Sequence, residues 1–169
     1  GDGSDDVGCG CFEAGPSGCD NTCGSTLEND DCGVCAGDGL SCISSDLFFS
    51  EYSEGTSNNK YLEIFNASEF PVNLQNYSLS RCTNGCTPIG EWENSFSLEE
   101  LGLIEPNETL VICHFDSDEF IINQCDVEYG IAWTGDDAFG LVWEYENLSE
   151  LIDIIGDLGS DVGDGWSVA

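Results

Sequence analysis

The chain has 169 residues, which suits one ordinary domain with an appendage, and enough apolar residues for a packed core. Its charge is extreme, because 34 acidic residues face only Lys60 and Arg81, giving a formal net charge of −32. This charge repels DNA, RNA and anionic lipid, so we expect no nucleic-acid or membrane partner. The acidity is typical of a solvated surface in saline, in either a halophilic or a secreted protein.

The eleven cysteines favour an oxidised, extracellular protein. A metal-binding role would need paired CxxC knuckles, whereas the chain has one CxxC, Cys32 to Cys35, and a single histidine. Seven cysteines fall within the first 43 residues, at Cys9, Cys11, Cys19, Cys23, Cys32, Cys35 and Cys42. Because seven is odd, one of them must stay free, pair with the rest of the chain, or bridge to another chain.

Residues 1–43 form a separate arm that is rich in Gly, Asp, Ser, Asn and Cys and has no periodic apolar segment. Such a segment is ordered only by disulfides, metal or a partner surface. Its run from Asp31 to Gly39, together with Cys42, resembles the "D-x-CGVCGGDG-x-x-C" module of extracellular matrix-type proteins, with Ala36 in place of a glycine. Cys9-Gly10-Cys11 is similar to the CxC that commonly precedes that module.

Residues 44–169 are expected to form an all-β sandwich of two sheets. Short apolar and aromatic runs separated by turn signals predict strands at 47–52, 60–66, 77–82, 109–114, 130–134, 138–144 and 151–156. Single helical turns are expected near 99–101 and 116–122. The apolar positions of these strands predict a buried core of Phe49, Leu62, Ile64, Leu79, Leu110, Ile112, Leu141, Ile152 and Ile154.

The stretch from Leu47 to Asn66 carries a specific resemblance. It follows the pattern "ISEY-x-EG-S-x-NK-x-LEI-x-N" at Ser50-Glu51-Tyr52, Glu54-Gly55, Ser57, Asn59-Lys60, Leu62-Glu63-Ile64 and Asn66. Further matches lie at 72–79, at the GDDA run from Gly135 to Leu141, and at 151–156. This part of the chain resembles the lamin tail domain, which implies an immunoglobulin-like β-sandwich.

Four cysteines lie in the sandwich, and each flanks a loop. The economical pairing is Cys82 with Cys86 and Cys113 with Cys125, in which each bond pins one loop. Pairing across the two loops is the alternative.

Catalysis finds little support, so we expect no enzymatic activity and no cofactor. The lone His114 ends an apolar strand, and no nucleophile pattern accompanies it. Structural Ca²⁺ is the one metal that the composition suits, through three acidic groups on Gly-rich loops. These groups are Asp2, Asp5 and Asp6; Asp30, Asp31 and Asp38; and Asp157, Asp161 and Asp164. Simple solvated acids are the alternative.

Four N-glycosylation sequons begin at Asn66, Asn76, Asn107 and Asn147. Each lies at an expected strand end or turn, so we expect all four to be accessible and at least two to carry N-linked glycan. Unused sequons in a prokaryotic protein are the alternative.

These observations favour a secreted, glycosylated structural protein, a subunit of an extracellular filament, coat or appendage. Residues 1–43 would dock on a neighbouring copy and build a homo-oligomer or homopolymer. The alternative is an arm folded onto its own sandwich or stapled into a compact knot. Two rival functions are an extracellular carbohydrate- or surface-binding module, with exposed aromatics such as Trp92 or Trp166, and a piece of a larger secreted enzyme.

Overall fold

The structure, a computed structural model, divides into two compact units, Gly1–Ile43 and Ser44–Ala169. The boundary lies where the sequence composition changes from Gly- and Cys-rich to strand-forming. The structure describes residues 8–10, 14–30, 33–37, 43–44, 46–86, 88, 90–130, 133–159 and 163. No helix within these residues is long and apolar enough to cross a membrane.

The first unit is held by disulfides and turns. Its short antiparallel hairpin pairs β1 (Pro16–Ser17) with β2 (Thr22–Cys23). Two disulfides tie the described segments, Cys9–Cys23 and Cys19–Cys35. This arrangement resembles the alternative of an internally stapled arm, whereas docking on a second copy stays a prediction.

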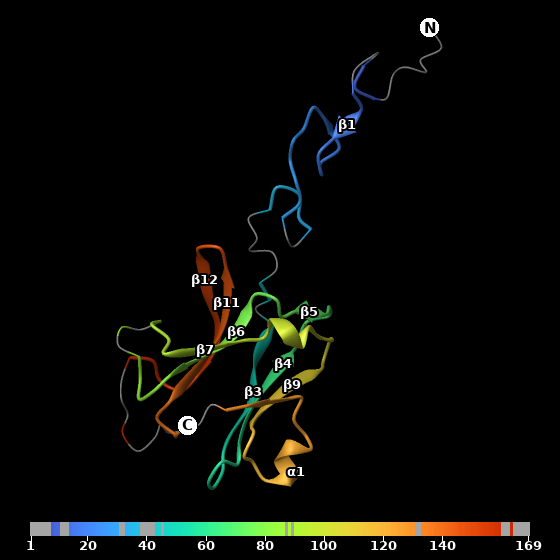
Figure 1. Cartoon of the computed structure of the whole chain (residues 1–169). Helices are drawn as coiled ribbons and strands as arrows, with labels where there is room; N and C mark the ends of the chain where they lie inside the picture. Colours follow the sequence, from blue (N-terminus) through green and yellow to red (C-terminus); the bar gives the residue numbers. More distant parts are fainter. Residues whose placement is uncertain are drawn as a thin grey trace. The chain divides into compact units, whose positions relative to one another are not determined.

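The second unit is a sandwich of two four-stranded sheets, so the predicted all-β sandwich is confirmed (Figure 1). One sheet has the order β10-β9-β4-β3, with bounds Val127–Tyr129, Thr109–His114, Lys60–Asn66 and Leu47–Glu54. The other has the order β12-β11-β6-β7, with bounds Leu148–Ile155, Ala138–Tyr145, Tyr77–Cys82 and Asn94–Ser97. The remaining elements are β5 (Val72–Asn73), β8 (Leu103–Ile104), η2 (Glu99–Leu101) and α1 (Glu119–Ile122).

The core lies between the two sheets. Of the predicted core positions, seven are buried: Phe49, Leu62, Ile64, Leu79, Leu110, Ile112 and Leu141. Ile152 and Ile154 are less completely buried than these seven, with intermediate exposure. Both lie on β12, an edge strand that has a hydrogen-bonded neighbour on one side only.

Side chains link the two sheets at both open sides of the sandwich. On one side, the backbone N–H of Phe49 on β3 donates to Oδ2 of Asp153 on β12, over 2.7 Å. On the other side, the rings of Phe96 on β7 and Tyr129 on β10 stack with their centroids 4.1 Å apart. Edge strands with such contacts present less free backbone to another chain.

The loop between β3 and β4 is closed tightly and fixed to the loop before α1. The side chain of Asn59 donates to the Asp118 carboxylate and accepts from the Asp118 N–H, each over 2.7 Å. The N–H of Gly55 donates to the carbonyl oxygen of Asn59, and a Cβ at Gly55 would lie 2.7 Å from that oxygen. The loop therefore requires a glycine at this position.

Four strands of the sandwich differ from the sequence-based prediction. The strand expected at 130–134 is instead β10, Val127–Tyr129, which runs parallel to β9. Thr134 lies in a turn because its N–H donates to Oδ2 of Asp137, and Trp133 packs edge-on against Phe139. Strand β7 and the short pair β5–β8 were not predicted. Helical turns lie near the two expected places, as η2 and α1.

Candidate functional site

A pocket of about 270 Å³ lies on the outer face of the sheet that contains β3, β4 and β9. This volume lies just below the roughly 300–1,000 Å³ of typical ligand clefts. We call it the outer-face pocket, and it is lined by Glu51, Tyr61, Glu63, Val111, Cys113, Phe120, Ile121 and Gln124.

The alternation of β4 places two of these side chains on the outer face. Along this strand Leu62 and Ile64 are fully buried, whereas Tyr61, Glu63 and Phe65 are half-buried between them. Side chains of a strand point to opposite faces in turn, so the half-buried set lies outside the sandwich. An irregularity after Phe49 shifts the register of β3 and places Glu51 directly opposite Glu63.

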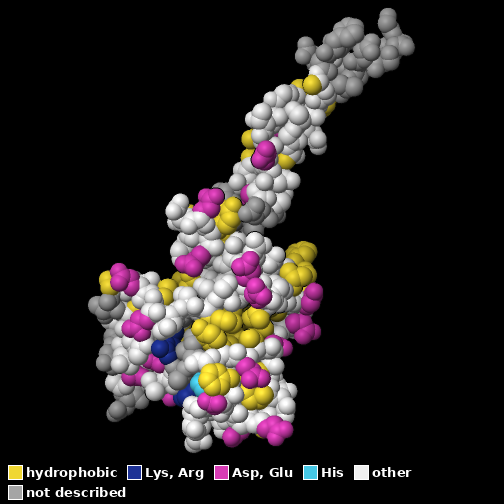
Figure 2. All heavy atoms as spheres, in the orientation of Figure 1, with side chains coloured by type: hydrophobic (Ala, Val, Ile, Leu, Met, Phe, Trp, Pro, Cys, Tyr) yellow, Lys and Arg dark blue, Asp and Glu magenta, His cyan; other side chains and the backbone are white. Residues whose placement is uncertain are grey.

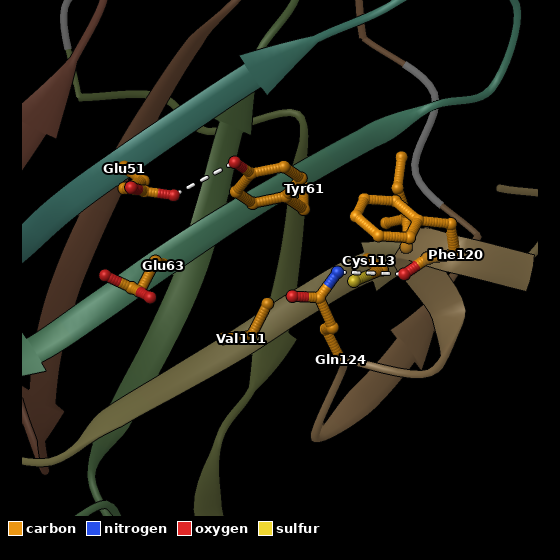
Figure 3. A pocket seen from close by; sticks show the side chains of 8 residues that line it. Glu51, Tyr61, Glu63, Val111, Cys113, Phe120 and Gln124 are labelled. Carbon is orange, nitrogen blue, oxygen red and sulfur yellow. Dashed lines mark hydrogen bonds between the residues drawn. The ribbon is translucent and has the colours of Figure 1, made fainter. Parts of the chain in front are cut away.

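The second wall of the pocket comes from α1 and the disulfide that follows it. Cys113 on β9 pairs with Cys125, and this bond holds the segment that contains α1 against the strand. Gln124 Nε2 donates to the carbonyl oxygen of Phe120 over 2.9 Å. The Phe120 side chain nevertheless remains 78% exposed and points from α1 toward Tyr61 (Figure 3).

The two glutamates of the pocket accept hydrogen bonds from neutral groups. The Tyr61 hydroxyl donates to Oε2 of Glu51 over 2.9 Å, and Ser50 Oγ donates to Oε1 of Glu63 over 2.6 Å. The bond to Glu51 raises the pKa of the Tyr61 phenol, and burial and the charges of both glutamates act in the same direction. The phenol therefore stays a donor at neutral pH.

An apolar area continues from the pocket along the same sheet. Phe48 and Phe65 meet edge-to-face with ring centroids 5.6 Å apart, and Phe48 is 39% exposed. Figure 2 shows hydrophobic side chains gathered over β3 and β4, with acidic side chains scattered around them. The outer face thus combines exposed aromatic rings with carboxylate and amide groups, which can stack on a ligand ring and hydrogen-bond to its polar rim.

The structure separates the four predicted glycosylation residues. Asn66 is fully buried, and its Nδ2, the atom that a glycan would occupy, donates to the carbonyl oxygens of Phe70, Ile104 and Glu105. The expectation that Asn66 is accessible is therefore wrong, because its amide bonds to the backbone inside the fold.

The other three sequons are more open. Asn107 and Asn147 are exposed in turns, and Asn76 is half-buried. The hydroxyl of the Asn76 sequon belongs to Ser78, which is buried and in hydrogen-bond contact with Ser80. Glycan on any of these residues stays a prediction.

The sandwich cysteines pair as the economical scheme has them, Cys82 with Cys86 and Cys113 with Cys125. In the first unit, Cys9, Cys19, Cys23 and Cys35 are paired, and the predicted cysteines Cys11, Cys32 and Cys42 lie outside the described residues. The four disulfides indicate an oxidising environment.

The calcium candidates fall partly outside the described residues, namely Asp2, Asp5, Asp6, Asp31, Asp38, Asp161 and Asp164. Among those described, Oδ1 of Asp30 accepts from the Val34 N–H over 2.8 Å and so orders a turn. In the described part of the chain, no three His, Cys, Asp or Glu side chains are grouped as a metal site.

The structure also places two other residues that the sequence analysis considered, His114 and Trp92. His114 is buried, and its Nδ1 accepts from the backbone N–H of Asp116 over 3.1 Å. Trp92 is partly buried against the Cys82–Cys86 disulfide and lies over Gly140, so it is not the exposed aromatic that the sequence suggested. Trp166 lies outside the described residues.

Sequence reasoning did not identify the outer-face pocket. The alternation of β4 could have placed Tyr61 and Glu63 on a solvent face. No sequence signal places Phe120 and Gln124 beside them, because this contact depends on how the Cys113–Cys125 disulfide turns the chain back.

Comparison with known families gives one match. Residues 43–156 match the family model described as Lamin Tail Domain. The comparison with curated proteins finds no match to this chain.

Proposed function

This chain belongs to the lamin tail domain family, and we propose that it is an extracellular carbohydrate-binding module. The observation that carries the proposal is the outer-face pocket, in which the rings of Tyr61 and Phe120 lie beside the carboxylates of Glu51 and Glu63.

The chemistry of this pocket suits a sugar ring. A pyranose presents an apolar C–H face and a rim of hydroxyl groups. The exposed Phe120 ring offers a surface for the C–H face, since aromatic rings gain most from burying flat apolar area. The free carboxylate oxygens accept hydrogen bonds from hydroxyl groups, and the Gln124 amide can both donate and accept. Ligand pockets commonly combine an apolar lining with a few such polar groups.

An extracellular setting is supported by three features. The disulfides require an oxidising environment, and the strongly acidic surface suits a saline medium. Sequons at the exposed Asn107 and Asn147 would carry glycans away from the outer-face pocket, because neither residue lines it. Secretion, glycosylation and structural calcium are parts of this proposal.

The direct test is calorimetric titration of the full chain with hexasaccharides of glucose, N-acetylglucosamine and glucosamine. We expect at least one of them to bind, and Phe120→Ala to weaken that binding about tenfold or more, as loss of a stacking surface does. Phe70→Ala is the matched control, because Phe70 is 72% exposed but lies outside the pocket. Equal effects of the two variants, or no binding of any sugar, would contradict the proposal.

A second candidate is a structural subunit that assembles through residues 1–43, and one observation favours it. The described disulfides engage eight of the eleven cysteines and leave Cys11, Cys32 and Cys42. Because three is an odd number, these cysteines cannot all pair with one another, and one of them is a candidate for a bond to another chain. The resemblance of residues 31–42 to a module of matrix-type proteins supports the same role.

Assembly is tested by removing residues 1–43 and comparing mass in calcium-containing saline. We expect the full chain to form disulfide-dependent oligomers and the truncated chain to stay monomeric. A full chain that remains monomeric would exclude the structural candidate and leave the carbohydrate-binding proposal untouched.

A further inference from the structure

The outer-face pocket contains an uncompensated pair of like charges. Glu51 and Glu63 are direct cross-strand partners on β3 and β4, and both line the pocket. Like charges directly opposite each other in a sheet are destabilising. Their hydrogen-bond donors, the hydroxyls of Tyr61 and Ser50, are neutral and leave both negative charges in place.

The chain has no cation of its own to place there. Its two basic residues are Lys60 and Arg81. Lys60 is buried on the inner face of β4, one residue from the outward Tyr61, and its Nζ lies 3.4 Å from Glu54 Oε1. Arg81 belongs to β6, in the opposite sheet. His114 is buried and does not line the pocket.

The aromatic rings of the pocket act in the same direction as the glutamates. A ring face carries partial negative charge and attracts a cation within about 6 Å, the more so when water is excluded. Figure 3 shows the Tyr61 ring between Glu51 and the ring of Phe120. An ammonium group held near the two carboxylates would therefore meet both full and partial negative charge.

The ligand should also be an extended ring system. Along the outer face of β4, Tyr61, Glu63 and Phe65 follow one another at every second residue, roughly 6–7 Å apart. Phe48 and Phe65 extend the apolar surface past the glutamates. A single cation would use only the glutamates, whereas a polymer of sugar rings that carries amines would use the whole row.

We propose that the outer-face pocket selects amino sugars, with a glucosamine ammonium group between Glu51 and Glu63 and the sugar faces on the aromatic rings. This inference rests on the proposed carbohydrate-binding function and names the class of sugar. Sulfated sugars and uronic acids are disfavoured, because a net charge of −32 repels them.

The test compares four probes by calorimetry at pH 6 in low salt: the hexamers of glucosamine, N-acetylglucosamine and guluronic acid, and hexalysine. We expect the glucosamine hexamer to bind about tenfold more tightly than its acetylated counterpart. The reason is the attraction of one ammonium group to two carboxylates and an aromatic ring. We expect the uronate not to bind, and the advantage of the amine to shrink strongly in 0.5 M NaCl, where exposed charges are screened.

Charge-neutral variants show whether the glutamates are responsible. Glu51→Gln and Glu63→Gln keep an oxygen that can accept from Tyr61 and Ser50, so the fold is retained and only the charge is lost. We expect each to reduce the preference for the amine at least threefold. Glu150→Gln is the control, because it removes the same charge from an exposed residue of β12.

The outcomes separate the two claims. Equal binding of amino and acetylated hexamers overturns the inference but leaves the carbohydrate-binding function in place. If none of these sugars binds, and the glucose hexamer does not bind either, both fail. Hexalysine binding as tightly as the glucosamine hexamer, or an equal effect of Glu150→Gln, indicates adsorption to an acidic surface and also overturns the inference.

Discussion

A single buried amide, Asn66, fixes the end of β4. Its Nδ2 donates to three backbone carbonyls, and its Oδ1 accepts from the N–H and the hydroxyl of Ser68. These bonds tie together segments near residues 66–70 and 104–105 that lack a shared strand ladder. The Asn66 side chain, although it begins a glycosylation sequon, therefore links these two segments of the fold.

Replacing Asn66 with alanine should destabilise the fold by about 2–4 kcal/mol, because buried carbonyl groups lose their donor. The measurement is the free energy of unfolding in urea with the disulfides intact. Asn94→Ala, at an exposed residue of β7, should change it by less than about 0.5 kcal/mol. If Asn66→Ala lowered the free energy of unfolding no more than Asn94→Ala does, the hydrogen bonds of Asn66 would not be needed for stability.

Tyr52 is expected to lower the stability of the fold at alkaline pH. Burial raises the pKa of this phenol, and the neighbouring Glu54 carboxylate, which accepts its hydrogen bond over 3.3 Å, adds to the rise. A pKa that is higher in the folded state than in the unfolded chain stabilises the fold below about pH 10, and this contribution is lost as the pH rises beyond that.

Folding stability should therefore fall above about pH 10, and less so in Tyr52→Phe, which keeps the ring beside Trp133. Urea unfolding at a series of alkaline pH values measures the difference. Parallel curves for the two proteins would assign the alkaline loss to other groups.

At the scale of elements, β11 shows how the outer face of the second sheet is covered. The ring of Trp92 lies directly against Gly140, and a Cβ there would also meet Leu151 Cδ1 at 2.9 Å. Gly140→Ala should cost about 1–3 kcal/mol through overpacking. The same change should cost less in a Trp92→Ala background, as measured by a double-mutant cycle. Equal losses of folding stability in both backgrounds would mean that the Trp92 ring does not limit the space at position 140.

The Cys113–Cys125 disulfide links stability to the pocket. It closes a loop of 12 residues, against 4 for Cys82–Cys86, so its removal should cost about 3 kcal/mol against about 2 kcal/mol. Replacing both Cys113 and Cys125 with alanine should also weaken sugar binding, because Phe120 loses its anchor. The variant that lacks Cys82–Cys86 should bind sugar normally, and weakened binding there would contradict the assignment.

The sequence predicted those elements that carry their own local pattern. In β4 the run of apolar and aromatic residues identified the strand, and its predicted core positions Leu62 and Ile64 are buried. The disulfide pairs could be predicted because each pair flanks a single loop, Cys82 with Cys86 and Cys113 with Cys125.

The features that the sequence analysis did not predict depend on contacts between residues far apart in the chain. Strand β10 is set by its parallel register with β9, and Asp137 holds the segment after it in a turn. The burial of Asn66 depends on the carbonyl of Ile104, far away in the sequence. The pocket was missed for the same reason, since Phe120 reaches Tyr61 only through the folded disulfide loop.

At the scale of the whole molecule, we expect the charge to lower stability. With 34 acidic and two basic residues, the folded state concentrates repulsion that the unfolded chain spreads out. We expect the urea midpoint to rise steadily as NaCl is added, because screening weakens this repulsion. CaCl₂ at the same ionic strength should raise it further only if calcium binds at specific sites. A midpoint independent of NaCl would contradict the account of the charge.

The outer-face pocket is the central claim, and its most direct test is nuclear magnetic resonance of the ¹⁵N-labelled chain. The protein is titrated with whichever hexasaccharide binds most tightly in calorimetry, and the backbone amide shifts are followed. The account predicts that the largest shifts cluster at Glu51, Tyr61, Glu63, Phe120 and Gln124. Shifts centred instead on Ser78 of β6 and Ser95 of β7, which line a second pocket on the other sheet, or the absence of any localised shift, would contradict it.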